Sequence, residues 1–89
     1  MLEREIKVSN RLGLHARAAA KLVQLLSGFQ SQVTLTGRGR EVNAKSIMGV
    51  LLLAAAPGAT LLVRVEGEDE LAALDAAVAL FDRRFDEDG

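Results

Sequence analysis

The spacing of apolar residues changes repeatedly along this chain, and that change limits the folds it can form. Residues 2–8 alternate, with Ile6 and Val8 on one face and charged side chains on the other, which is typical of a half-buried strand. From Ala16 the spacing lengthens to three and four residues, as on one face of an amphipathic helix. An 89-residue chain with both periods predicts one domain, over residues 1–89, of mixed strands and helices.

Two further strands and a tight turn are expected after the first helix. Gly28 is placed to end that helix in the left-handed conformation, and Val33 and Leu35 mark a second strand. Residues 37–39, with two glycines, predict a hairpin turn into a short strand around Val42. A turn of that length favours antiparallel pairing.

A short helix, a strand and a longer helix complete the order. Ser46 is a good N-cap and predicts a helix over the apolar run that follows it, ended by Pro57 and Gly58. Residues 61–65 alternate again. The last helix carries one apolar stripe, made of Leu71, Leu74, Val78 and Phe81. We expect the acidic residues 86–89 to fray. The order βαββαβα predicts an α+β domain with helices on one face of an open sheet.

Composition excludes several kinds of site. The chain has no cysteine and one histidine, so disulfides, iron–sulfur clusters and thiol chemistry are ruled out and a metal site is not expected. The charged start of the sequence differs from a signal peptide, and the apolar run 50–57 is far below the roughly 20 residues of a membrane span. We expect a cytoplasmic protein with no bound cofactor and no membrane attachment.

The charge is divided unevenly. Residues 1–45 hold eight Lys and Arg against three Glu, whereas residues 46–89 hold three Arg against nine Asp and Glu. A basic half in a nearly neutral protein indicates an anionic ligand or an acidic partner, although solvated surface charges would give the same count. Arg38 and Arg40 have no aromatic neighbour on which a base could stack, so nucleic acid is not expected.

His15 is the first candidate for chemistry. It is the one side chain that titrates near neutrality without perturbation, and it precedes the helix that starts about Ala16. Unpaired N–H groups and partial positive charge at a helix start favour a neutral imidazole, whose lone pair is free to attack. The same N–H groups would receive an anion formed on that ring. From spacing alone, an ordinary surface histidine near a helix cap remains the alternative.

Arg17 lies two residues further on, in the first turn of the helix. Its planar guanidinium can bind two phosphate oxygens at once. A cation in a first turn is unfavourable to the helix dipole by about 0.3–1 kcal/mol, which an anion at this place would offset. His15, Arg17 and the helix start therefore predict a phosphoryl-accepting site, unless Arg17 is simply a solvated charge.

The segment that begins at Ser46 is the second candidate region. The Ser46 hydroxyl fits an N-cap, and a phosphate on it would add about −1.5 to −2 charges beside an apolar patch. Ile47, Met48 and Leu51 fall on one side of the short helix. An all-apolar helix is either buried on both sides or offers one side to a partner, and methionine suits a surface that accepts several partners.

Two motifs carry a resemblance to a known family. Residues 13–17, Gly-Leu-His-Ala-Arg, resemble the active-site motif of the HPr family, the histidine-containing phosphocarriers of the phosphoenolpyruvate-dependent phosphotransferase system. Residues 43–50, Asn-Ala-Lys-Ser-Ile-Met-Gly-Val, resemble that family's second motif. The separation of the motifs, the length and the element order also agree, and the likeness covers residues 2–85.

The resemblance implies an open-faced β-sandwich: a four-stranded antiparallel sheet of order 1-4-2-3, with three helices on one face. It also implies a carrier, not an enzyme in the usual sense, that takes a phosphoryl group on Nδ1 of His15 from phospho-enzyme I and passes it to enzyme IIA components. The backbone of Ala16, Arg17 and Ala18 would cradle the phosphate, with Arg17 stabilising it. The family usually has Pro where this chain has Ala18, and we still expect the helix to start normally.

By the same resemblance, Ser46 matches a regulatory serine that a dedicated kinase, HPr kinase/phosphorylase, modifies in part of the family. Ile47, Met48 and Leu51 would form the docking patch of a monomeric carrier. On electrostatic grounds we also expect Arg17, Lys21 and Lys45 to face acidic partner surfaces. Two alternatives remain at this point. One is the nitrogen-related regulatory branch, and the other is a binding module controlled through Ser46 with no carrier role.

Overall fold

The computed structural model describes residues 1–87 and contains every element expected from the periodicity. In chain order the elements are β1 (Leu2–Lys7), α1 (Ala16–Leu26), β2 (Gln32–Gly37), β3 (Arg40–Asn43), α2 (Ile47–Leu52), β4 (Thr60–Glu66), α3 (Glu70–Asp82) and the 3₁₀ turn η1 (Arg84–Asp86). Among these residues, no helix is both long enough and apolar enough to cross a membrane.

The four strands pair in the order β1-β4-β2-β3, and every pair is antiparallel. This confirms the strand order that the family resemblance implied. β2 and β3 are joined by a two-residue loop in which Arg38 and Gly39 both have positive φ, 54° and 76°. A two-residue loop with both central φ values positive is the hairpin turn whose twist matches that of the strands.

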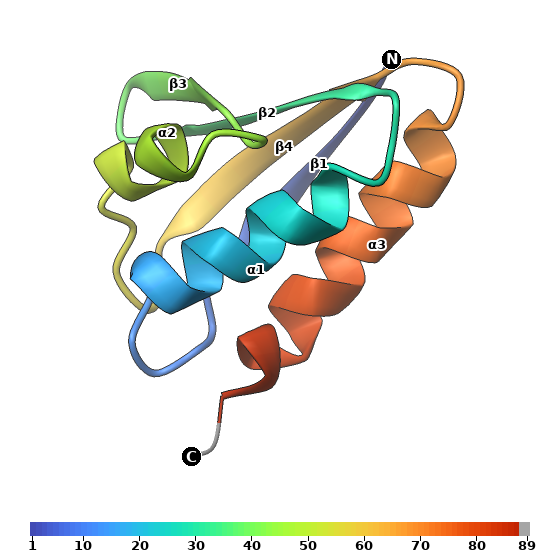
Figure 1. Ribbon diagram of the computed structural model, residues 1–89. Helices are drawn as coiled ribbons and strands as arrows, with labels where there is room; N and C mark the ends of the chain where they lie inside the picture. The colour runs from blue at the N-terminus through green and yellow to red at the C-terminus, as the bar shows by residue number, and fades with distance from the viewer. Residues whose placement is uncertain (88–89) are drawn as a thin grey trace.

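The three helices lie on one face of the sheet, as expected (Figure 1). α1 turns Ala19, Leu22 and Leu26 inward, and each is fully buried against the sheet. The sheet contributes its alternate residues, among them Val33 and Val63. The core is aliphatic because branched side chains from the pleated face meet small and branched side chains from the helices.

Three details of the expected elements are wrong. Gly28 does not have a positive φ, and α1 ends at Leu26 with the C-cap Ser27 in a right-handed helical conformation. α2 ends at Leu52, well before Pro57, and Ala54 takes the left-handed conformation beyond its end. Leu71 is 63 % exposed and does not join the buried stripe of α3.

The acidic C-terminal residues differ from expectation too. Asp86 and Glu87 do not fray: Asp86 closes η1, and Glu87 contacts the turn before α1. Phe85 is buried in the core cluster and holds this end in place. Asp88 and Gly89, for which fraying was also expected, lie outside the described residues.

Asp69 connects the start of α3 to the loop before β2. Its carboxylate accepts hydrogen bonds from the backbone N–H groups of Gln30 and Ser31, both at 2.9 Å, and from the Ser31 hydroxyl. The Ser31 hydroxyl, and then the Gln30 amide, hold the pKa of the Asp69 carboxyl below its usual value. Asp69 occupies the N-cap position of α3, but its carboxylate binds a distant loop and makes no side-chain capping hydrogen bond to its own helix.

Leu22→Ala tests the core that supports α1. Leu22 is fully buried, so removing most of its side chain should lower the free energy of unfolding by about 2–5 kcal/mol. Urea denaturation followed by circular dichroism measures it. Gln24→Ala, at an exposed position of the same helix, should change the value by about 0.5 kcal/mol or less. Equal losses in the two variants would contradict this account of the core.

Candidate functional site

His15 occupies the N-cap position of α1, as its place in the sequence predicted. Its backbone is extended (φ −81°, ψ 177°), and its Nδ1 atom accepts a hydrogen bond from the backbone N–H of Arg17 at 3.3 Å. The side chain is 27 % exposed. The imidazole is therefore held at the helix start with one edge open to solvent, in a position that a partner protein can reach.

One first-turn amide of α1, that of Arg17, contacts this ring. The first backbone hydrogen bond of the helix runs from Ala19 N–H to the carbonyl of His15, at 2.9 Å. The amides of Ala16, Arg17 and Ala18 therefore precede the internal ladder of the helix, where N–H groups have no partner inside the helix and can receive an anion; that of Arg17 donates to Nδ1 of His15. The family usually has proline where this chain has Ala18, and α1 starts at Ala16, so the helix does start normally.

A constrained turn positions His15. Gly13 is left-handed, with φ 67°, and its carbonyl accepts a hydrogen bond from the buried Asn10 side chain at 2.7 Å. The next amide, that of Leu14, donates to the carbonyl of Ala55 at 2.9 Å. A β-carbon added at Gly13 would lie 2.5 Å from that Ala55 oxygen. Only glycine satisfies both the backbone angle and the close approach at this position.

Glu87 is a neighbour of His15 that sequence analysis did not identify. One carboxylate oxygen, Oε2, lies 3.1 Å from Nε2 of His15, and the other, Oε1, accepts the Leu12 N–H at 3.3 Å. The amide nitrogen of Asn10 also donates to this carboxylate. Hydrogen bonds from Asn10 and then His15 lower the pKa of the Glu87 carboxyl, so it is ionised at neutral pH.

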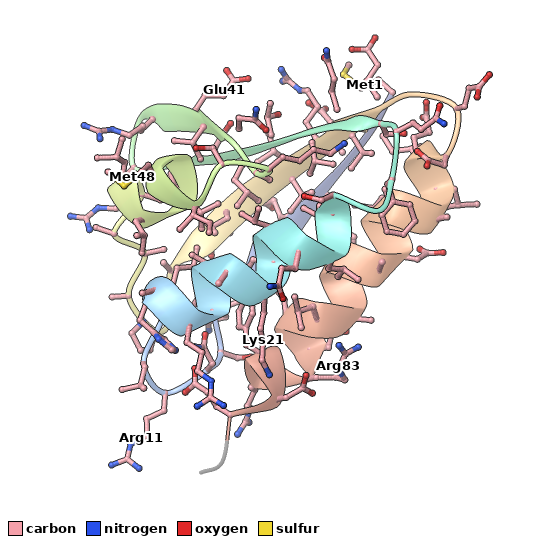
Figure 2. All side chains as sticks on the ribbon, in the orientation of Figure 1. Met1, Arg11, Lys21, Glu41, Met48 and Arg83 are labelled. Atoms are coloured by element: carbon pink, nitrogen blue, oxygen red, sulfur yellow. The ribbon has the colours of Figure 1, made fainter. Side chains whose placement is uncertain are left out.

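The C-terminal segment that carries Glu87 is fastened to both α3 and α1. The ring of Phe85 packs edge-to-face on Phe81 with centroids 4.8 Å apart. Lys21 donates from Nζ to the carbonyl of Phe85 at 3.0 Å and lies 3.5 Å from the Asp86 carboxylate. Figure 2 shows Lys21 directed from α1 toward this segment. Lys21, predicted to face a partner, is therefore already in contact with the protein's own chain.

A shallow cavity of about 320 Å³ opens beside His15. Its lining includes the cationic residues Arg11 and Arg17 and the acidic residues Asp86 and Glu87. None of the ion pairs found within residues 1–87 involves Arg17. Its guanidinium is exposed at the cavity and is available to an incoming anion.

The structure places Ser46 at the N-cap of α2, as predicted. Its hydroxyl oxygen accepts the Gly49 N–H at 3.1 Å, and the side chain remains partly accessible. Within residues 1–87 there is no cluster of His, Cys, Asp or Glu side chains that could hold a metal ion.

The apolar patch on α2 differs in part from the expectation. Ile47 and Met48 are 42 % and 68 % exposed, but Leu51 is half-buried and packs against the core. Leu52, at 56 % exposed, is the third large apolar side chain on the surface of this helix. Figure 2 shows Met48 on the outer side of α2. Lys45 donates to the carbonyl of Phe29 at 2.6 Å, so it too is engaged within the chain.

Residues 2–83 match the sequence family described as the PTS HPr component phosphorylation site. Phosphocarrier protein HPr of Xylella fastidiosa strain Temecula1 is 62 % identical over 88 residues, covering 99 % of each chain. This chain belongs to the HPr family of phosphocarriers of the phosphotransferase system.

Other members of the family differ in branch and in assembly. Phosphocarrier protein NPr of Shewanella violacea is 44 % identical, over 97 % of this chain and 94 % of its own. The crystal structure of HPr-C-His from Thermoanaerobacter tengcongensis covers all of both chains with a TM-score of 0.95 at 42 % identity. A structure of an HPr dimer from the same organism covers 98 % of this chain and 100 % of its own, with a TM-score of 0.78 at 42 % identity.

Gly13→Ala tests the turn that positions His15. The added methyl would meet the Ala55 carbonyl, and the left-handed backbone would be strained, so we expect a loss of about 1–3 kcal/mol in the free energy of unfolding together with slower phosphorylation of His15. Gly39→Ala is the control, because Gly39 is also left-handed but has nothing within 4 Å. It should lose stability and keep the phosphorylation rate. Equal rates in the two variants would show that the turn does not position the ring.

Proposed function

We propose that this protein accepts a phosphoryl group on Nδ1 of His15 from phospho-enzyme I and passes it to enzyme IIA components of the sugar phosphotransferase system. The observation that supports this most is the partly exposed His15 ring at the start of α1, beside a cavity with Arg17 on its wall. We place the carrier in the cytoplasm and expect it to act as a monomer, although a family member has been solved as a dimer.

The transfer itself needs little from this chain. The lone pair of Nδ1 attacks phosphorus in line with the departing group of the donor. The N–H of Arg17 then donates to a phosphate oxygen in place of Nδ1. The guanidinium of Arg17 and the amides of Ala16 and Ala18 balance the charge of the bound phosphoryl group. Partner proteins supply the alignment, so a shallow open site serves two partners in turn.

The docking surface proposed beside this site is the apolar patch of α2. Ile47, Met48 and the accessible part of Leu51 form its centre, and the exposed Leu52 extends it. Lys21 borders the site with about a third of its side chain accessible, which suits an acidic partner. Small apolar patches with a cationic border favour fast, weak association.

Ser46 is the proposed regulatory position. A kinase of the HPr kinase/phosphorylase type would place about −1.5 to −2 charges at the start of α2. Since Ser46 directly precedes Ile47 and Met48, the phosphate would change partner choice at the patch without unfolding the helix. A module controlled through Ser46 without carrier activity would retain its function in His15→Ala.

The nitrogen-related branch remains the second candidate function. Its support is the 44 % identity to the NPr of Shewanella violacea. The higher identity of 62 % to the HPr of Xylella fastidiosa favours the first function. Transfer to a sugar-type enzyme IIA favours the first function, and transfer only to a nitrogen-type enzyme IIA favours the second.

Phosphorus NMR of the purified protein, incubated with enzyme I and phosphoenolpyruvate, tests the carrier function. We expect an acid-labile phosphohistidine that is absent in His15→Ala. Arg17→Ala should still be labelled, but about 10- to 100-fold more slowly, since a hydrogen bond to a charged group is worth about 1.5–3 kcal/mol. Labelling of His15→Ala at the normal rate would exclude His15 as the carrier residue.

Met48→Asp tests the docking patch. Because Met48 is largely exposed, the substitution should leave the melting temperature unchanged. The KM of enzyme I for this protein should rise about tenfold or more, as expected of a residue at the centre of an interface. Leu71→Asp is the matched control, an equally exposed apolar residue on α3. An unchanged KM in Met48→Asp, or an equal rise in both variants, would remove α2 as the docking surface.

A further inference from the structure

We propose that Glu87 is a positioning residue for the phosphoryl transfer: it keeps the proton on Nε2 of His15 and balances the charge that the ring acquires when Nδ1 is phosphorylated. This inference rests on the proposed carrier function and adds to it a residue 72 positions away from His15 in the sequence.

The hydrogen bonds at the two ring nitrogens select one tautomer. The N–H of Arg17 points at Nδ1, and a nitrogen that accepts a hydrogen bond must carry a lone pair. The proton of the neutral imidazole therefore belongs on Nε2. That atom lies 3.1 Å from Oε2 of Glu87, which accepts it. The lone pair needed for attack on phosphorus is thus present before any donor arrives.

Glu87 is itself held in place. Its carboxylate takes hydrogen bonds from the side chain of Asn10 and the amide of Leu12, both in the turn that positions His15. Asn10 is completely buried and cannot follow the carboxylate outward. The buried Phe85, two residues earlier, fastens the segment to the core. Ring and carboxylate are therefore oriented by the same turn.

The other charged side chains near the ring either pair with other residues or line the cavity. Asp86 pairs with Lys21 at 3.5 Å and with Arg83 at 3.1 Å. Arg11 and Arg17 line the cavity and suit the phosphoryl dianion. Among residues 1–87, Glu87 is the carboxylate that the structure pairs with a nitrogen of His15.

The proton and electron balance of the step shows what this carboxylate contributes. The Nδ1 lone pair forms the P–N bond while the bond from phosphorus to the donor breaks, and the donor atom leaves with its electron pair. No proton leaves the ring, so the ring becomes positively charged next to the Glu87 carboxylate. In onward transfer the P–N pair returns to Nδ1 and the same neutral tautomer is restored. The Nε2 proton never has to travel.

Two substitutions in the full-length protein separate orientation from charge. Glu87→Gln can still accept the Nε2 proton through its amide oxygen but has no charge, and Glu87→Ala provides neither. Nitrogen NMR of the unphosphorylated imidazole at high pH should show the Nε2–H tautomer alone in the wild type and in Glu87→Gln, and a mixture in Glu87→Ala. Phosphorylation by enzyme I should slow about tenfold in Glu87→Gln and more in Glu87→Ala, with the KM for enzyme I unchanged.

Asp82→Asn is the matched control, since it removes one exposed negative charge from the end of α3 without touching the site. It should behave as the wild type in both measurements. If the wild type is phosphorylated on His15 and the Glu87 variants match Asp82→Asn in rate and tautomer, the inference about Glu87 is wrong and the carrier function stands. If the wild type is not phosphorylated, the carrier function is wrong, and the tautomer in Glu87→Ala still decides whether Glu87 holds the Nε2 proton.

Discussion

The turn from Asn10 to Leu14 is the constraint on which the site depends. It is fixed from inside by the Asn10 side chain, which bonds to the Gly13 carbonyl, and from outside by the Ala55 carbonyl, which accepts the Leu14 amide. A left-handed glycine allows both contacts. His15 follows directly, so its ring meets the first amides of α1 without any adjustment of the chain. The family's chemistry thus begins with the geometry of a backbone turn.

Most of the fold could be predicted because its pattern is local. Alternation in β4 and the three-and-four spacing in α1 each depend on residues that are close in sequence. The exceptions involve contacts that no short window contains. Asp69 is at the N-cap position of α3, yet its carboxylate accepts the Ser31 amide of a distant loop. Leu71 fits the helical stripe, but no element covers it. The strand order came from the family resemblance, since periodicity does not specify which strands become neighbours.

The same distinction between local features and distant contacts applies to the site. The position of His15 at the helix start and the capping role of Ser46 could be predicted, because capping follows from residue type and place. The contacts of Glu87 with His15 and Asn10 could not be predicted. Glu87 lay in an acidic run without internal pattern, and only the path of the chain after α3 brings it to the imidazole. The basic first half and acidic second half were the one sequence feature compatible with such a contact, but they named no residue.

The turn at residues 84–86 is strained, and this strain affects how easily the segment opens. Arg84, Phe85 and Asp86 all have φ values of 56–59°, and each non-glycine residue in this conformation costs about 1–2 kcal/mol. Burial of the Phe85 ring returns about 1.5–3 kcal/mol, and the Lys21 hydrogen bond about 1 kcal/mol. These contributions and the hydrogen bonds of Glu87 offset the strain of the turn, so the segment stays attached, with less net stabilisation than the helices it joins. Its amide protons should therefore exchange with solvent through local opening before those of α3.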